Sequence, residues 1–279
     1  MNAAIVLFMD SPSLQQQAAE IYALLKDPAR RFSSVELWLF YKGAPPERFP
    51  APDCSISAVR LVAVRQDDHL PESRLQMLSQ LADRFAVELI LFPSDGLGME
   101  LATRLAYRLS GSACLQVLAY GISGHTVTVT KPVYGSNLRA RFRLTAPPYC
   151  LSMARQPCRP IPLVPLPDHT PEIIPLNTAP CAWVKETVTV PDPPDTGLTD
   201  ADRVIVVGQG AANRETVDYI KGIAAGIGAE LGASRPVVMN AWTDMSRLVG
   251  VSGAILSPRL CIAAGVSGTA VFAAGIRAS

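Results

Sequence analysis

Short apolar runs alternate with longer amphipathic segments over the first 111 residues of the chain. The apolar runs predict strands at residues 3–9, 35–41, 59–64 and 88–93. The amphipathic segments predict helices at residues 13–27, 71–86 and 94–111. Strands and helices in this order are typical of βαβ units, in which helices cover a mainly parallel sheet. We therefore expect residues 1–154 to form an N-terminal three-layer α/β domain.

The helix predicted at residues 94–111 carries its own boundary signals. Ser94 and Asp95 precede it as candidate N-caps, because their side-chain oxygens can accept hydrogen bonds from its first backbone N–H groups. Gly111 follows it as a stop signal. Leucines at helical spacing form one apolar face, at positions Leu97, Leu101, Leu105 and Leu109. This helix should pack on the sheet through that face.

A different pattern occupies residues 125–144, where apolar and polar residues alternate with a period of two. The alternation runs on both sides of the turn Tyr134-Gly135-Ser136-Asn137. This arrangement predicts a β-hairpin that closes the first domain.

Proline dominates the stretch from residue 155 to residue 200, which holds 11 of the 24 prolines in the chain. Proline at this density excludes helices and favours extended chain. We interpret residues 155–200 as a connection between two domains. Its apolar residues, such as Ile161, Leu163 and Val164, indicate that part of it lies along a surface. Residues 183–190 alternate in period two and are expected to add one strand.

A second domain is expected at residues 201–279, with a strand at Arg203–Val207, a Gly208-Gln209-Gly210 turn and a helix from Asn213 to about Leu231. The turn lacks the third glycine of the dinucleotide fingerprint, so NAD on a standard Rossmann loop is not supported. Two further glycine-serine turns follow, at residues 248–255 and 263–270. Glycine lets a ligand approach the backbone closely, and serine offers a hydroxyl for hydrogen bonding.

Arg235 lies near these turns and has two interpretations. An arginine at the end of a helix is often a solvated surface residue, and glycines after a parallel strand often serve only the backbone angles of the turn. Three such turns within about 60 residues of one another, together with Arg235, favour a cofactor site instead.

Composition narrows the classes of function. The chain has 279 residues and a net charge of +1, with no basic stretch of the kind that nucleic acid or an acidic membrane surface requires. Its opening residues have no basic leader and are too short to span a bilayer, so an integral membrane protein is not expected. Six separated cysteines without a CxxC pair indicate reduced thiols in the cytoplasm.

Three histidines, His69, His125 and His169, stand at no metal-ligand spacing, so we expect no metal site. With so few histidines, acid-base or nucleophilic catalysis by side chains is not indicated. Any chemistry is therefore expected to reside in a cofactor.

The segments VIVVGQGA, LGASRPVV and VGVSGAILSPRLCIAAGVSGTAVFAAG resemble, in the same order, the FAD-binding domain of the electron transfer flavoprotein α subunit, including its bacterial fixation-type branch. The resemblance implies a C-terminal FAD-binding domain of nucleotide-binding type and a heterodimer with a smaller β subunit. It also implies an electron carrier between a dehydrogenase donor and a quinone- or ferredoxin-linked acceptor, with no substrate transformed by the protein itself.

Carried over residue by residue, the resemblance places Ser234 near the cofactor and the guanidinium of Arg235 over the flavin ring. Ser252 would stand where a hydroxyl meets flavin N5, and Ser267 with neighbouring amides would hold the phosphates. The cofactor-binding residues that it implies are Gln209, Gly210, Ser234, Arg235, Val249, Gly250, Val251, Ser252, Ser267, Gly268, Thr269 and Phe272.

The chain also departs from the family pattern. Gln209 replaces the usual arginine of the first turn, Met239 replaces an acid, and Val271-Phe272 replaces a Gln-His pair. A phenyl ring fills space but cannot donate a hydrogen bond. The sequence ends at GIRAS, where the family continues with a segment that holds the adenosine half, so the second domain is expected to be shortened relative to the family. Two alternatives follow from these departures: a degenerate scaffold subunit without flavin, and an NAD- or nucleotide-binding enzyme on a related fold.

Overall fold

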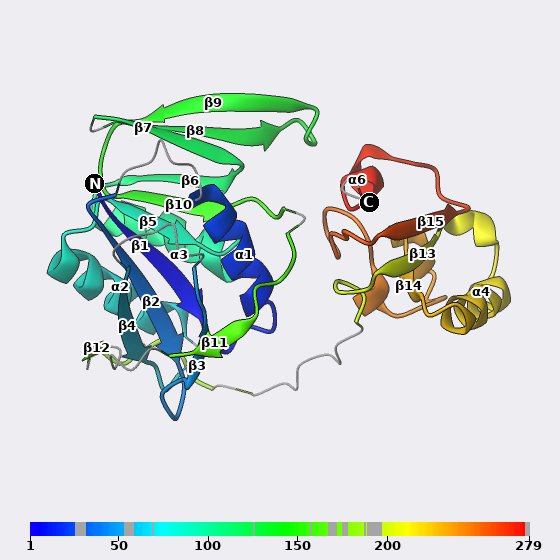
Figure 1. Cartoon of the computed structure of the whole chain (residues 1–279), viewed down its shortest axis with the longest axis horizontal. Helices are drawn as coiled ribbons and strands as arrows, with labels where there is room; N and C mark the ends of the chain where they lie inside the picture. The colour runs from blue at the N-terminus through cyan, green and yellow to red at the C-terminus, as the bar shows by residue number, and fades with distance from the viewer. Residues whose placement is uncertain are drawn as a thin grey trace. The chain divides into compact units, whose positions relative to one another are not determined.

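The computed structural model describes residues 1–25, 32–52, 59–68, 70–124, 126–156, 158–166, 172–174, 178–186, 188 and 197–276. The chain forms two compact units (Figure 1), unit 1 at Met1–Glu186 and unit 2 at Thr187–Ser279. Residues 155–186 of the proline-rich stretch therefore belong to unit 1. Both units are mixed α/β, and the main sheet of each is parallel, as predicted.

Unit 1 is built on a seven-stranded sheet in the order β12-β4-β2-β1-β5-β10-β6, in which every neighbouring pair is parallel. Its strands are β1 (Asn2–Phe8), β2 (Ser34–Tyr41), β4 (Val59–Arg65), β5 (Leu89–Phe92), β6 (Ser112–Val117), β10 (Tyr149–Met153) and β12 (Glu172–Ile174). The central strand β1 is apolar and buried from Ala3 to Phe8, and helices or strands cover both of its faces.

Alternate residues of β1 enter two separate cores. Ala4, Val6 and Phe8 pack on the face covered by helices α2 (Pro71–Phe85) and α3 (Gly96–Arg108). Ile5 and Leu7 pack on the opposite face. The elements that cover this second face are helix α1 (Leu14–Leu25), the paired short strands β3 (Arg48–Pro50) and β11 (Leu163–Pro165), and a small antiparallel sheet.

The antiparallel sheet consists of β7 (Ala119–Ser123), β8 (Thr126–Val133) and β9 (Leu138–Leu144). Strands β8 and β9 form the hairpin that the period-two pattern predicted, and the turn lies at residues 134–137. Val127 and Val129 on its inner face are buried in the core.

Two predicted elements differ in the structure. The helix predicted from Asn213 to Leu231 is α4 (Arg214–Gly226), and the next residues form strand β14 (Glu230–Ala233). The reason is the turn at Gly228, whose φ of +64° is a left-handed conformation that favours glycine and ends the helix. The strand predicted at 183–190 is absent from its described residues, 183–186 and 188, because Trp183 and Val188 are exposed and pair with no sheet.

Unit 2 has a three-stranded parallel sheet in the order β14-β13-β15, with β13 at Arg203–Val207 and β15 at Leu260–Ala264. On one face, Ile205 and Val207 pack toward α4. On the other face, Val204 and Val206 pack with Val249, Leu256 and Phe272. The short helices of this unit are η1 (Gln209–Ala211), α5 (Arg235–Met239), η2 (Met245–Arg247) and α6 (Ala270–Ala273).

Candidate functional site

The turns that follow the three strands of unit 2 lie at one edge of its sheet, because parallel strands end on the same side. After the central strand β13, the chain forms β14 on one side of it. Strand β15 comes later in the sequence and pairs with β13 on the other side. Open α/β sheets bind ligands outside the carboxyl ends of the strands, at the point where the strand order reverses. The three turns are therefore candidates to line one site.

The turn after β13 packs directly against the turn after β15. A Cβ atom on Gly208 would lie 2.1 Å from the backbone oxygen of Gly265, and one on Gly210 would lie 2.8 Å from the Cα atom of Gly265. The Gly210 N–H donates to the Gly265 carbonyl at 2.9 Å. Because Gly208 and Gly210 have no side chain, the backbones of these two turns can touch. This contact holds the two turns together.

The turn after β14 carries Ser234 and Arg235. The Ser234 N–H donates to the carbonyl of Val207 at the end of β13, so Ser234 is buried close to the sheet. Arg235 is the first residue of α5, and Pro236 follows it in the first turn, where proline costs no hydrogen bond. Arg235 thus begins a short helix rather than ending a long one, and its side chain is exposed at the carboxyl edge of the sheet.

A fourth turn, at residues 248–254, folds back beside β14. Val249 donates its N–H to the carbonyl of Ala233, and the Val251 N–H donates to the carbonyl of Val271. Nη2 of Arg235 donates to Oγ of Ser252 at 2.5 Å. This hydrogen bond joins the turn after β14 to the fourth turn.

The turn after β15, residues 265–269, leads into α6. The Thr269 side chain accepts a hydrogen bond from the N–H of Phe272, at 3.4 Å, and caps this single helical turn. The helix that follows this turn is only four residues long.

Together these turns line a pocket of about 650 Å³, which lies within the range of small-molecule and cofactor sites. The predicted residues that line it are Gln209, Gly210, Ser234, Arg235, Val249, Ser252, Ser267, Thr269 and Phe272. The predicted residues outside its lining are Gly250, Val251 and Gly268. Gly250 and Val251 instead form the backbone of the fourth turn, and Gly268 has a left-handed φ of +66°.

Five further residues line the pocket and were not predicted: Pro236, Leu248, Gly265, Val266 and Val271. All five stand next to or inside the quoted turns. Gly265 could have been found from its place inside the predicted glycine-serine turn at residues 263–270.

The pocket has the chemical character of a site for an anionic or electron-rich group. Among the described residues that line it, Arg235 is the only one with a formal charge. Four hydroxyl side chains surround it, from Ser234, Ser252, Ser267 and Thr269. Because Oγ of Ser252 accepts from Arg235, its own O–H remains able to donate into the pocket. The same holds for Thr269, whose oxygen accepts from the backbone.

The positions that depart from the family pattern have different surroundings. Phe272 is 8% exposed and packs in the core with Val249 and Leu256, while one side of it reaches the pocket wall. Gln209 and Val271 line the pocket as uncharged residues. Met239 is 66% exposed and lies outside the lining. Val271 and Phe272 therefore give the pocket an apolar wall at two of these positions.

Other predictions from the sequence concern cysteine, histidine and membrane segments. Cys114, Cys150, Cys158, Cys181 and Cys261 are free thiols, and Cys54 lies outside the described residues. His69, His125 and His169 also lie outside them. The described residues contain no cluster of three or more metal-ligating side chains. Within the same residues, every helix is too short or too polar to cross a bilayer.

Comparison with protein families finds one match in each unit of the chain. Residues 197–277 match the family described as the electron transfer flavoprotein FAD-binding domain. Residues 53–180 match the family described as the electron transfer flavoprotein domain. The first match contains every residue that lines the pocket.

Individual relatives agree with this assignment. The electron transfer flavoprotein subunit YgcQ of Escherichia coli K12 is 38% identical over 213 residues, which cover 75% of this chain and 71% of the relative. Protein FixB of Escherichia coli O127:H6 is 28% identical over 225 residues, covering 77% of this chain and 69% of FixB. Protein FixB of Bradyrhizobium diazoefficiens is 27% identical over 215 residues, covering 75% and 58%.

The pocket at the carboxyl edge of unit 2 thus falls inside a matched FAD-binding domain, and residues 53–180 of unit 1 match a domain of the same family. Subunits of the α type in this family pair with a β subunit. The chain belongs to the electron transfer flavoprotein family, as an α-type subunit of the fixation branch with FAD as its cofactor.

Proposed function

We propose that the residues around Arg235 hold the redox-active ring of FAD, and that the protein carries electrons as one subunit of a heterodimer. The observation that supports this most directly is the hydrogen bond from Arg235 to Ser252 across the wall of the pocket. This hydrogen bond links Arg235, the one charged residue among the described residues that line the pocket, to the hydroxyl of Ser252. That hydroxyl can still donate a hydrogen bond of its own. FAD, when bound, accepts and releases electrons singly or in pairs.

Arg235 would favour negative charge on a bound group. The interaction of a cation with such a charge is stronger in a poorly solvated pocket than in water. The hydrogen bond to Ser252 restrains the guanidinium, so less side-chain entropy is lost when a ligand binds. Ser252 and Thr269 would donate hydrogen bonds, and Ser267 would contact an anionic group.

The apolar side of the pocket would exclude water and shape the site without adding charge. Phe272 is held by the core, and Leu248 is also buried. In this chain, the stabilisation of negative charge on a bound group would therefore depend mainly on Arg235 and less on hydrogen bonds from other residues of the pocket.

We propose that the partner of this chain is a β-type subunit of the same family. Electrons would arrive from a dehydrogenase and leave to a quinone- or ferredoxin-linked acceptor. The cytoplasmic location indicated by the cysteine pattern remains part of this proposal.

The test is co-expression of the chain with its β-type partner, followed by purification, acid extraction and quantification of flavin by absorbance and chromatography. We expect about one FAD released per heterodimer from wild type. A colourless heterodimer would instead favour the degenerate scaffold, for which the apolar Phe272 and Val271 are the structural arguments. Nicotinamide-dependent turnover of a substrate by the purified protein would favour an enzyme.

A further inference from the structure

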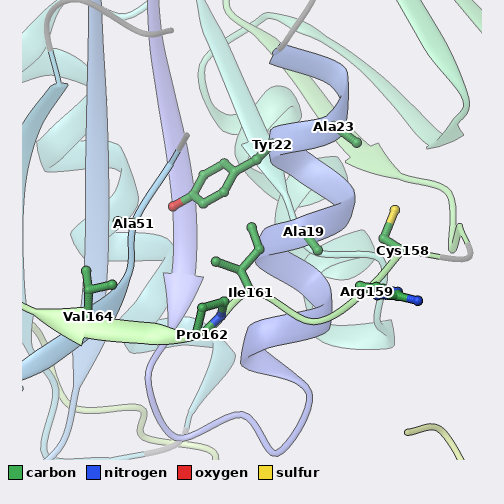
Figure 2. Close-up of a pocket in the computed structure, with 9 residues that line it drawn as sticks. All are labelled: Ala19, Tyr22, Ala23, Ala51, Cys158, Arg159, Ile161, Pro162 and Val164. Atoms are coloured by element: carbon green, nitrogen blue, oxygen red, sulfur yellow. The ribbon is translucent and has the colours of Figure 1, made fainter. Parts of the chain in front are cut away.

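A second pocket lies in unit 1, apart from the residues matched as an FAD-binding domain. It has a volume of about 520 Å³ and opens between helix α1 and the chain segment 158–164 (Figure 2). We call the described residues 156 and 158–166 the strap. The residues that line the pocket are Ala19, Tyr22, Ala23, Ala51, Cys158, Arg159, Ile161, Pro162 and Val164.

The strap is fixed on both sides of the pocket. At one end, the N–H of Gln156 donates to Oε1 of Glu20, and its carbonyl accepts from Nε2 of Gln16. The N–H of Ile161 donates to the carbonyl of Gln15 at 3.2 Å. At the other end, β11 pairs with β3. The pocket is therefore a feature of the folded chain, held open between anchored points.

Small side chains create the space. Ala19 and Ala23 stand one helical turn apart on α1, and Ala51 follows β3 (Figure 2). The ring of Tyr22 forms a wall, since its hydroxyl already donates to the carbonyl of Pro50 at 2.8 Å. Ile161, Pro162 and Val164 add aliphatic surface. The interior thus offers a ligand hydrocarbon contacts and few hydrogen bonds.

Two lining residues have a different chemistry, and both lie at the same end of the pocket. Arg159 is exposed, and its guanidinium has no ion-pair or hydrogen-bond partner among the described residues. Cys158 is half-buried, and burial, followed by the nearby Glu20 carboxylate, raises the pKa of its thiol. Glu20 is a buried residue of α1, accepts hydrogen bonds from Gln16 and Gln156, and does not line the pocket.

We propose that this pocket binds a small monocarboxylate with a hydrocarbon body, placing the body between α1 and the strap and the carboxylate beside Arg159. A volume of about 520 Å³ is in the range of small-ligand sites. The guanidinium of Arg159, which has no partner among the residues that the structure describes, would supply a charge-assisted hydrogen bond for the carboxylate. This proposal concerns unit 1 alone and does not depend on how FAD is held.

The experiment follows alkylation of Cys158 by iodoacetamide in the wild-type heterodimer, measured by peptide mass mapping with and without sodium octanoate. Octanamide serves as the uncharged probe of the same length. Cys181 and Cys261 are internal controls, because they lie outside the pocket. We expect octanoate to slow the alkylation of Cys158 severalfold in a saturable manner, leaving both controls unchanged, and octanamide to act only at higher concentration.

Two variants separate charge from shape. Arg159→Gln should raise the octanoate concentration needed for half-protection roughly tenfold, as expected for loss of a charged hydrogen bond, while the effect of octanamide stays the same. Ala23→Phe, on the exposed side of α1, should fill the pocket and abolish the effect of both probes, with the far-ultraviolet circular dichroism unchanged.

Three results would overturn the proposal. The first is an unchanged Cys158 rate in wild type at millimolar octanoate. The second is equal slowing of all three cysteines, which indicates a general effect on the protein. The third is equal potency of octanoate and octanamide in wild type, which removes Arg159 from the site.

Discussion

Nη2 of Arg235 lies 2.5 Å from Oγ of Ser252, so a residue at the start of α5 is tied to a turn 17 positions further along the chain. The contact closes one side of the pocket at the carboxyl edge of unit 2. It gives the guanidinium a defined position before any ligand arrives.

Replacing Arg235 should change the reduction potential of bound flavin. Arg235→Ala removes the one formal charge of the described lining, so added negative charge is less stabilised. We expect the potential to fall by tens of millivolts, since about 59 mV corresponds to about 1.4 kcal/mol for one electron. Arg235→Lys should recover part of the loss, because an ammonium cannot reproduce a planar guanidinium. The measurement is a spectroelectrochemical titration of the heterodimer.

The matched control for this charge change is Arg203→Ala, at the opposite end of β13. Its guanidinium donates to the carbonyl of Ile227 and does not line the pocket. If Arg235→Ala binds FAD as wild type does and its potential lies within about 10 mV of wild type, Arg235 is a solvated surface residue.

A methyl group at Gly208 should separate the two turns that it joins. Gly208→Ala would place Cβ 2.1 Å from the backbone oxygen of Gly265, and neither backbone can move freely. We expect a loss of about 1–3 kcal/mol in the free energy of unfolding of unit 2, as for other overpacked sites. Hydrogen exchange of the β13 amides reports this unit separately from unit 1.

Gly222→Ala is the control for the same chemical change in the same unit. Gly222 lies inside α4, and nothing is within 4 Å of a Cβ atom built on it. Alanine should therefore stabilise the helix by about 0.5–1 kcal/mol. Similar destabilisation by both substitutions would show that the contact of Gly208 with Gly265 is not the cause.

Asp95 should stabilise unit 1 through two hydrogen bonds. Its Oδ1 accepts from the Gly98 N–H at 2.6 Å as the N-cap of α3, and its Oδ2 accepts from Nε2 of Gln17 at 2.8 Å. Asp95→Ala should lower the free energy of unfolding by about 1–2 kcal/mol. Asp95→Asn keeps a capping oxygen and should lose less. Urea unfolding followed by the fluorescence of buried Trp38 measures both, and equal losses would point to charge instead of capping.

Glu20 should make the stability of unit 1 depend on pH. Burial raises the pKa of its carboxyl, and hydrogen bonds from Ser94, Gln156 and Gln16 offset this in part. The folded state thus keeps a proton that the unfolded chain releases, so this group weakens the fold as pH rises through the folded pKa. Relative to wild type, Glu20→Gln should gain stability between acidic and neutral pH in urea titrations. A constant difference between the two proteins across that range would contradict this.

The strands and helices with strong periodicity could be predicted from the sequence, and the reason is physical. Strand β1 and helix α3 bury continuous or helical apolar patterns, so local sequence and tertiary packing agree. Strands β3, β11 and β12 could not be predicted, because three residues carry no periodicity and only their partners define them. β14 was missed because its four residues, ELGA, are too few to show a period of two and follow closely on the small residues that end α4.

The residues of the candidate site could be predicted from sequence motifs, but the contacts that hold these residues in place could not. A turn such as Gly208-Gln209-Gly210 has the same sequence whether a ligand or another backbone approaches it. Its contact with Gly265 joins positions more than 50 residues apart, which no local pattern reports. Likewise, the sequence named Phe272 as a departure but could not reveal that the core holds it in place.

Strand β12 has a consequence for work with unit 1 as an isolated fragment. It pairs along the outer side of β4 through Glu172, Ile173 and Ile174. A fragment ending at Ala154 would lack it, and the unpaired N–H and C=O groups of β4 would form a bare sheet edge that recruits other chains. We expect such a fragment to aggregate and one extending past Ile174 to stay dispersed, so the stretch rich in proline also protects the sheet from self-association.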